Sequence, residues 1–141
     1  CQPIAQLAAG LGPGAFSVLT FNVNDDCVSE SAAPGWTLED QHLALASLIE
    51  YHKPDVLCLQ ECMSCADSAA SWLFRSKYDL HGSAFSHRGA CLLFLRKGGR
   101  LAAAGQPRSI GPVALLPAAL GVPGGPQLYV ACGHLAPHKE G

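Results

Sequence analysis

Short apolar runs alternate along the chain with polar segments rich in turn-forming residues, and their spacing predicts the first three elements. Residues 16–23 alternate apolar and polar side chains and are rich in strand formers, which predicts a strand. Residues 38–52 carry apolar side chains at helical spacing after Thr37, which favours a helix N-cap, and Pro54 ends this helix. Residues 56–59 are continuously apolar, which predicts a strand buried on both faces.

The remainder of the chain predicts one further helix and several short strands. The expected elements are a helix over residues 66–76, a strand over 90–95, a weak strand from Arg100, an apolar segment at 113–116 and a last strand over 128–133. Residues 1–15 are rich in alanine, glycine and proline, which predicts an irregular lead-in. This order of elements predicts an α/β fold with a mixed sheet and covering helices.

Composition and charge narrow the class of protein. The 141 residues match the length of one ordinary domain. A hydrophobic fraction of 49% and a charged fraction of 14% exclude a disordered tail, which would be polar and highly charged. The formal net charge of −2 does not fit a strongly basic nucleic-acid module, and no apolar run is long enough to predict a transmembrane segment.

The seven cysteines, an odd number, favour reduced thiols over a disulfide framework. Cys58 and Cys132 lie inside apolar runs and Cys91 lies beside one, where a thiol packs as a small hydrophobic group. We therefore expect an intracellular protein of the cytoplasm or nucleus, where thiols stay reduced. Cys62 and Cys65 form a lone C-x-x-C pair, which leaves open a zinc or redox role or two thiols in a loop that enters a helix.

Polar residues follow three apolar strands at their carboxyl ends. Asn22 ends the first strand, Glu61 follows the second and His134 follows the last. In open α/β sheets the ligand crevice lies outside the carboxyl ends of the strands, so we expect these three side chains to converge on one rim.

Four segments resemble motifs of the endonuclease/exonuclease/phosphatase (DNase I-like) family. They are Thr20 to Val23, the Pro-Asp-Val-Leu-Cys-Leu-Gln-Glu run from Pro54 to Glu61, Gly89 to Arg96, and Gly133-His134-Leu135, so that the match spans residues 16–138. The resemblance implies a four-layer α/β sandwich, of which residues 16–141 form the N-terminal part. It also implies hydrolysis of phosphoesters with a divalent cation, usually Mg²⁺, with Mn²⁺ as the other option.

The resemblance assigns expected roles to the three strand-end residues. Glu61 would bind the metal, and Asn22 would orient the carboxylate or contact the metal or the phosphate. His134 would contact the scissile phosphate as a hydrogen-bond donor. This donor set suits Mg²⁺, which prefers carboxylate oxygens and keeps several waters. The expected catalytic residues are His134 and Asn22, the expected metal ligands are Glu61 and Asn22, and His134 is the expected substrate-binding residue.

Two later motifs of the family, Gly-Asp-x-Asn and Ser-Asp-His, do not occur in the chain. These motifs supply the aspartate that orients the attacking water and a second histidine, so we expect these 141 residues to be inactive alone. Relatives cleave nucleic acids, phospholipids or inositol phosphates, and the compact motif spacing favours a tyrosyl-DNA phosphodiesterase 2-like enzyme acting on 5′-tyrosyl DNA. The alternative is a non-catalytic relative that keeps the fold and binds partners, and the oligomeric state stays open.

Overall fold

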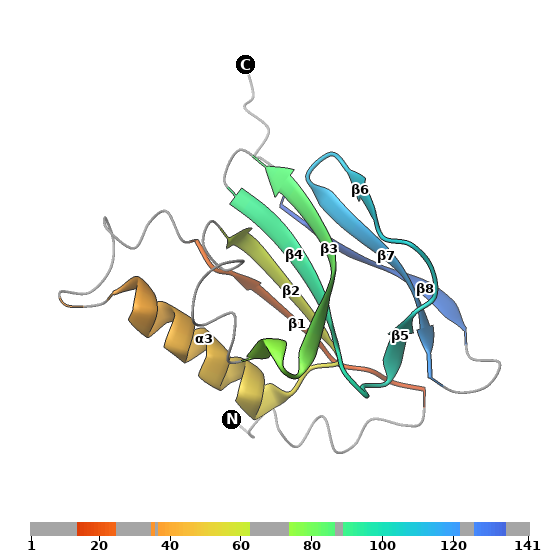
Figure 1. Cartoon of the computed structure of the whole chain (residues 1–141), viewed down its shortest axis with the longest axis horizontal. Helices are drawn as coiled ribbons and strands as arrows, with labels where there is room; N and C mark the ends of the chain where they lie inside the picture. The colour runs from red at the N-terminus through yellow and green to blue at the C-terminus, as the bar shows by residue number, and fades with distance from the viewer. Residues whose placement is uncertain are drawn as a thin grey trace.

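The computed structural model describes residues 14–24, 35, 37–62, 74–86, 89–121 and 126–134. In this part of the chain, a helix lies on one face of a first sheet and a second sheet lies on its other face (Figure 1). These are three of the four layers that the resemblance implies, and the expected α/β fold is confirmed. None of the described helical residues form a segment that is both long and apolar enough to span a membrane.

The first sheet is mixed, as expected. Its strands are β1 (Val18–Asn22), β2 (Val56–Cys62), β3 (Tyr78–Ser86) and β4 (Gly89–Arg96), in the spatial order β1-β2-β4-β3. β1 runs parallel to β2, whereas β4 is antiparallel to both of its neighbours. A helix connects β1 to β2, which allows the two strands to run parallel. Their carboxyl ends therefore lie at the same edge of the first sheet.

The second sheet is antiparallel and is built around β7 (Val113–Leu120). β8 (Gln127–Gly133) pairs along one edge of β7, and the short strands β5 (Leu101–Ala103) and β6 (Arg108–Ile110) share the other edge. Pro117 lies within β7, and its carbonyl accepts a hydrogen bond from the Ala104 N–H at 2.9 Å. In an antiparallel strand the N–H and C=O of one residue point to the same side, so this carbonyl shows where the N–H would lie. The N–H that proline lacks would therefore face the gap between β5 and β6, where no strand needs it.

The helix α3 (Leu38–His52) begins and ends at the residues that the sequence predicts. Thr37 and Asp40 form a capping box in which the Asp40 N–H donates to Thr37 Oγ1 at 3.1 Å and the Thr37 N–H donates to Asp40 Oδ2 at 2.9 Å. Lys53, in a left-handed conformation with φ 45°, closes the helix before Pro54. The buried stripe that packs on the first sheet consists of His42, Leu45, Ala46 and Ile49.

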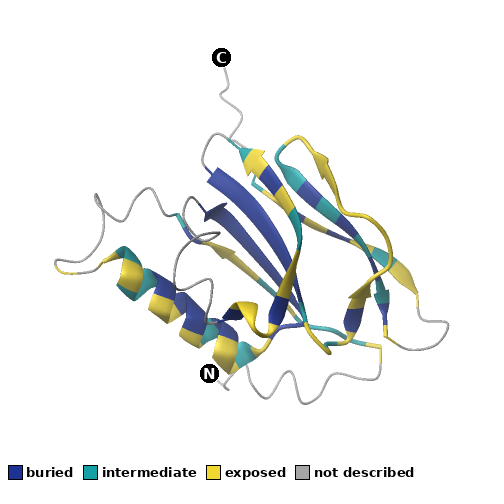
Figure 2. Ribbon diagram, in the orientation of Figure 1, coloured by how far each residue is buried: buried dark blue, intermediate teal, exposed yellow. Residues whose placement is uncertain are grey.

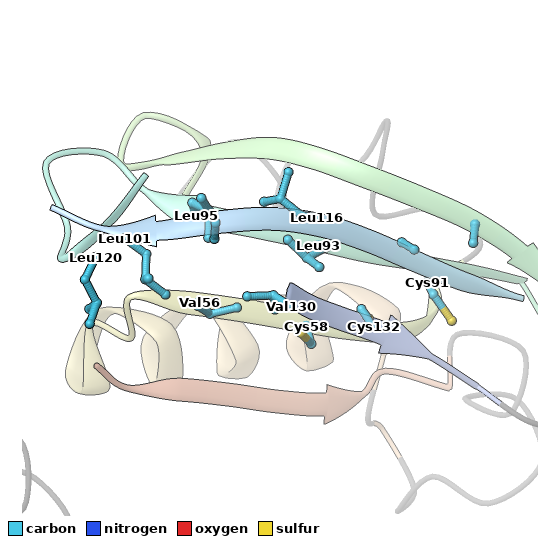
Figure 3. Close-up of a cluster of buried hydrophobic side chains, with 13 residues drawn as sticks. Val56, Cys58, Cys91, Leu93, Leu95, Leu101, Leu116, Leu120, Val130 and Cys132 are labelled. Atoms are coloured by element: carbon cyan, nitrogen blue, oxygen red, sulfur yellow. The ribbon is translucent and has the colours of Figure 1, made fainter. Parts of the chain in front are cut away.

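The side chains of β2 and β4 alternate between two hydrophobic cores. On β2, Val56 and Cys58 face the second sheet, whereas Leu57 and Leu59 face α3. Figure 3 shows the core between the sheets, and Figure 2 shows that β2 and β4 are buried along their length. Burial on both faces explains why the sequence of β2 is continuously apolar rather than alternating.

A buried carboxylate joins the strands at the end of the sandwich opposite Glu61. Asp55 Oδ2 accepts hydrogen bonds from the Ser17 N–H at 3.0 Å and the Ser17 hydroxyl at 3.1 Å. Its Oδ1 accepts one from the Arg100 N–H at 3.1 Å and lies 3.4 Å from Arg96 Nη2. Burial alone raises the pKa of Asp55, but these hydrogen bonds and the charge of Arg96 outweigh it, so the pKa is lowered.

Several elements differ from the sequence predictions. β2 continues three residues past the apolar run at 56–59, and β7 extends well beyond 113–116. The pattern does not predict β3, because its polar and small residues, such as Gly82 and Ser83, are weak strand formers that gain order by pairing with β4. The helix expected over 66–76 and the lead-in over 1–15 lie almost entirely outside the described residues.

Candidate active site

Glu61 lies at a β-bulge near the carboxyl end of β2. The pairing of β2 with β4 shifts register between Leu59 and Cys62, and Glu61 has a positive φ of 53°. Leu59 and Cys62 both belong to the core beneath α3, although residues three apart in a regular strand face opposite sides. The bulge therefore lets Gln60 and Glu61 both project from the other face, toward the second sheet.

The backbone conformation of Glu61 is energetically unfavourable. A left-handed conformation costs an L-residue with a side chain about 1–2 kcal/mol relative to a right-handed one. The side chain is also buried, with 6% exposed, which disfavours a charged carboxylate that lacks partners. Backbone strain of this kind clusters at active sites and ligand clamps, which makes Glu61 a candidate functional residue.

His134 contacts Glu61 from the second sheet. It directly follows β8, and its Nε2 lies 3.1 Å from Glu61 Oε1. The imidazole is partly exposed at 23%, but its Nδ1 is buried and has no hydrogen-bond partner among the described residues. When Nε2–H donates to the Glu61 carboxylate, this hydrogen bond fixes the orientation of the ring. The other ring nitrogen, Nδ1, then has no hydrogen bond to any described group.

Asn22 ends β1 at the same edge of the sheet. It pairs in register with Gln60, the residue before Glu61, and it is exposed. Thr20, two residues earlier on the same face of β1, contacts the Gln60 side chain at 3.1 Å. The structure thus brings Glu61 and His134 into direct contact and places Asn22 on the adjacent strand end, as the sequence predicts.

These residues fit part of a magnesium site. Glu61 supplies a carboxylate and Asn22 a carboxamide, and Mg²⁺ is commonly held by one or two carboxylates with waters and substrate phosphates filling the remaining positions. Within the described ranges, no group of three or more histidine, cysteine, aspartate or glutamate side chains is placed to hold a metal ion. The other ligand positions would therefore come from water, from phosphate or from further protein groups.

The cysteines near this end pack as buried thiols. Cys58, Cys91 and Cys132 lie between the two sheets. Burial is the main reason that the pKa of Cys91 rises to about 11, and a hydrogen bond with Cys58 is the main reason that the pKa of Cys132 is raised. Cys62 is buried beneath α3, whereas Cys65 lies outside the described residues, so the zinc or redox role of this pair stays a hypothesis.

Gln60 is a residue that the sequence analysis missed. It belongs to the motif from Pro54 to Glu61, in which only the neighbouring Glu61 has an expected role. Gln60 is 8% exposed and hydrogen-bonds to Thr20, Cys58 and Cys132. A polar side chain directly after a buried apolar run was the available signal, because buried polar groups require partners.

A model of the endonuclease/exonuclease/phosphatase family matches residues 19–130, and the chain belongs to this family. No curated protein matches the sequence significantly.

Three solved structures resemble the fold. The human Nocturnin catalytic domain with a bound sulfate anion has a TM-score of 0.65 and 19% identity, with 89% of this chain and 51% of that chain covered. D. rerio TDP2, humanized by 14 mutations, has a TM-score of 0.66 and 18% identity, covering 88% and 52%. ANGEL2, a 2′,3′-cyclic phosphatase in complex with adenosine-2′,3′-vanadate, has a TM-score of 0.69 and 17% identity, covering 86% and 41%.

These likenesses bear on the fold. At such low identities they show a shared architecture, which confirms the expected DNase I-like arrangement. The chain spans about half the length of the Nocturnin and TDP2 structures that it matches.

Proposed function

We propose that this chain is part of a divalent-metal-dependent phosphoester hydrolase. The observation that carries the proposal is the contact between Glu61 and His134. A buried carboxylate in a strained backbone conformation lies 3.1 Å from an imidazole nitrogen, at the edge of the sheet where Asn22 also ends its strand. Family membership supports a hydrolase, and this donor set supports a hard cation such as Mg²⁺ or Mn²⁺.

Each residue has a distinct role in this proposal. Glu61 holds the cation through a carboxylate oxygen, and the bulge at Glu61 turns its side chain toward the second sheet, where it contacts His134. Asn22 contacts the cation or the phosphate without adding charge. His134 donates one hydrogen bond from Nε2–H to Glu61, which orients the ring, and contacts the scissile phosphate through Nδ1, which donates when the ring carries its second proton. When bound, the cation polarises a phosphoryl oxygen and offsets the charge that develops in the transition state.

We propose a nucleic-acid phosphoester as the substrate, with 5′-tyrosyl DNA as the first compound to test. The similarity of fold to D. rerio TDP2 and to ANGEL2, which is seen with an adenosine vanadate, supports this choice over a phospholipid or an inositol phosphate. Reduced thiols at Cys58, Cys91 and Cys132 support an intracellular location in the cytoplasm or nucleus.

The test measures hydrolysis by the full-length protein that carries this chain. Bis-(p-nitrophenyl) phosphate, 5′-tyrosyl DNA and sphingomyelin are each assayed with Mg²⁺, with Mn²⁺ and with chelator. Glu61→Gln removes the negative charge but keeps the shape, and we expect it to lower kcat by at least about 100-fold. Glu39→Gln, on the exposed first turn of α3, is the matched control and should leave kcat unchanged.

The result that contradicts the proposal is a folded protein that hydrolyses none of these compounds, or one in which Glu61→Gln and Glu39→Gln are equally active. Either result would favour a non-catalytic relative that keeps the fold and binds partners.

A further inference from the structure

The Gln60 side chain joins three strands, and the proposed reaction gives it no role. Its Nε2 lies 3.1 Å from Thr20 Oγ1 on β1, 3.3 Å from the Cys58 carbonyl oxygen on β2 and 3.4 Å from Cys132 Sγ on β8. An amide nitrogen carries two protons, so three acceptors share the whole donor capacity of this group.

Each of these contacts lies close to a candidate site residue. Thr20 and Cys132 each lie two residues before one of them, Asn22 and His134 respectively, and the amide's own residue directly precedes Glu61. Two residues of extended strand span about 7 Å. The amide therefore holds the three strands together at positions no more than two residues from the candidate site residues.

The contact with Cys132 crosses from one sheet to the other. Apart from the hydrogen bonds of Cys132 with Cys58, Cys91 and the Leu59 carbonyl, the contacts in this core are between apolar side chains, which attract without fixing a direction. A hydrogen bond has a narrow range of distance and angle, so it fixes one strand against the other. Cys132 Sγ also lies 3.6 Å from the Leu59 carbonyl oxygen, so this thiol donates to β2 and accepts from Gln60. Figure 3 shows Cys58 and Cys132 next to each other in this core.

We propose that Gln60 is a positioning residue that sets the geometry of Glu61, His134 and Asn22 by holding the ends of β1, β2 and β8 in one arrangement. The proposal rests on the hydrolase function proposed above, because it assigns Gln60 to the same site. Gln60 acts through its neighbours and does not contact the reacting atoms. A displacement of about 1 Å in a catalytic group is sufficient to lower a rate about 100-fold.

The main variant is Gln60→Met, which keeps the length of the side chain and removes both N–H donors. The matched control is Gln127→Met, at the exposed first position of β8. Two readouts are taken on the full-length protein: the Glu61 Oε1–His134 Nε2 distance in a crystal structure of each variant, and kcat and KM with Mg²⁺. We expect Gln60→Met to move this atom pair out of hydrogen-bond range and to lower kcat about 100-fold with little change in KM.

Substitutions at the acceptors test the same idea if Gln60→Met does not fold. Cys132→Ser keeps an acceptor for the amide and should retain the Glu61–His134 contact and most of kcat. Cys132→Ala and Thr20→Val each remove one acceptor, and both should lengthen the contact and lower kcat in part. A merely structural role would lower stability in these variants but leave the contact distance and kcat of the folded protein unchanged.

The two proposals fail in different ways. If Glu61→Gln is inactive while Gln60→Met keeps the contact distance and wild-type kcat, the positioning role is wrong and the hydrolase stands. If the wild-type protein hydrolyses none of the substrates, the hydrolase is wrong, and the crystallographic distance still decides whether Gln60 holds Glu61 and His134 together.

Discussion

Replacing Asp55 with alanine is the sharpest test of what holds the sandwich together. The substitution removes the acceptor for the backbone N–H groups of Ser17 and Arg100, and for the Ser17 hydroxyl. A buried donor left without an acceptor costs about 1–3 kcal/mol, so two such N–H groups would lower the free energy of unfolding by about 2–6 kcal/mol. Ser17 is half-buried and Arg100 is exposed, so water replaces part of the loss. We expect the free energy of unfolding to fall by about 2–4 kcal/mol.

The effect of Asp55→Ala should depend on pH in a defined direction. Because folding lowers the pKa of Asp55, its contribution is complete above its unfolded pKa of about 3.9 and is lost as pH falls through the lower folded pKa. The difference in stability between the wild type and the variant should therefore be largest near neutral pH. It should shrink as the pH is lowered below about 4.

The assay is urea unfolding followed by circular dichroism at several pH values. Asp79→Ala is the control, because Asp79 is exposed and its pair with Lys97 at 3.4 Å lies on the surface, where such pairs contribute at most about 1 kcal/mol. A loss below about 1 kcal/mol for Asp55→Ala, or a loss that does not change with pH, would refute the reasoning.

Two further substitutions test the packing and the helix cap. The Tyr78 hydroxyl donates to the Pro54 carbonyl at 2.8 Å, so Tyr78→Phe should lower the free energy of unfolding by about 1 kcal/mol in urea titrations. Burial raises the pKa of Tyr78 from 10.0 to about 12, so the wild type should lose stability as pH rises through this interval. Tyr78→Phe should lose less stability over the same interval. Equal losses in the two proteins would contradict the assignment of the raised pKa to Tyr78. Thr37→Ala removes the cap of α3 and should cost about 1 kcal/mol in thermal unfolding, whereas Thr37→Ser should cost little.

The elements that the sequence predicts best are those with local signals. The bounds of α3 follow from Thr37 at the cap and Pro54 after the last turn, which act within a few residues. β3 has no such signal, because its order comes from pairing with β4 and its edge position demands few apolar side chains. The true length of β2 depends on a bulge, and a bulge is set by the partner strand rather than by local propensity.

The candidate site was predictable in outline and not in detail. The strand ends alone indicate Asn22, Glu61 and His134 and suggest that they converge, and the resemblance assigns their expected roles. The 3.1 Å contact between Glu61 and His134 requires two sheets to pack in one register, which no local pattern encodes. The contacts of Gln60 with Thr20 and Cys132 join residues 40 and 72 positions apart, so they become visible only in the folded chain.

At position 61 the left-handed backbone favours one residue, whereas the proposed metal site requires another. Glycine adopts this conformation without penalty, so a sequence selected for foldability alone would place glycine at position 61. Glycine there would also remove the carboxylate that contacts His134. A design that optimises this fold for thermal stability would therefore favour glycine at position 61 and remove the proposed metal ligand.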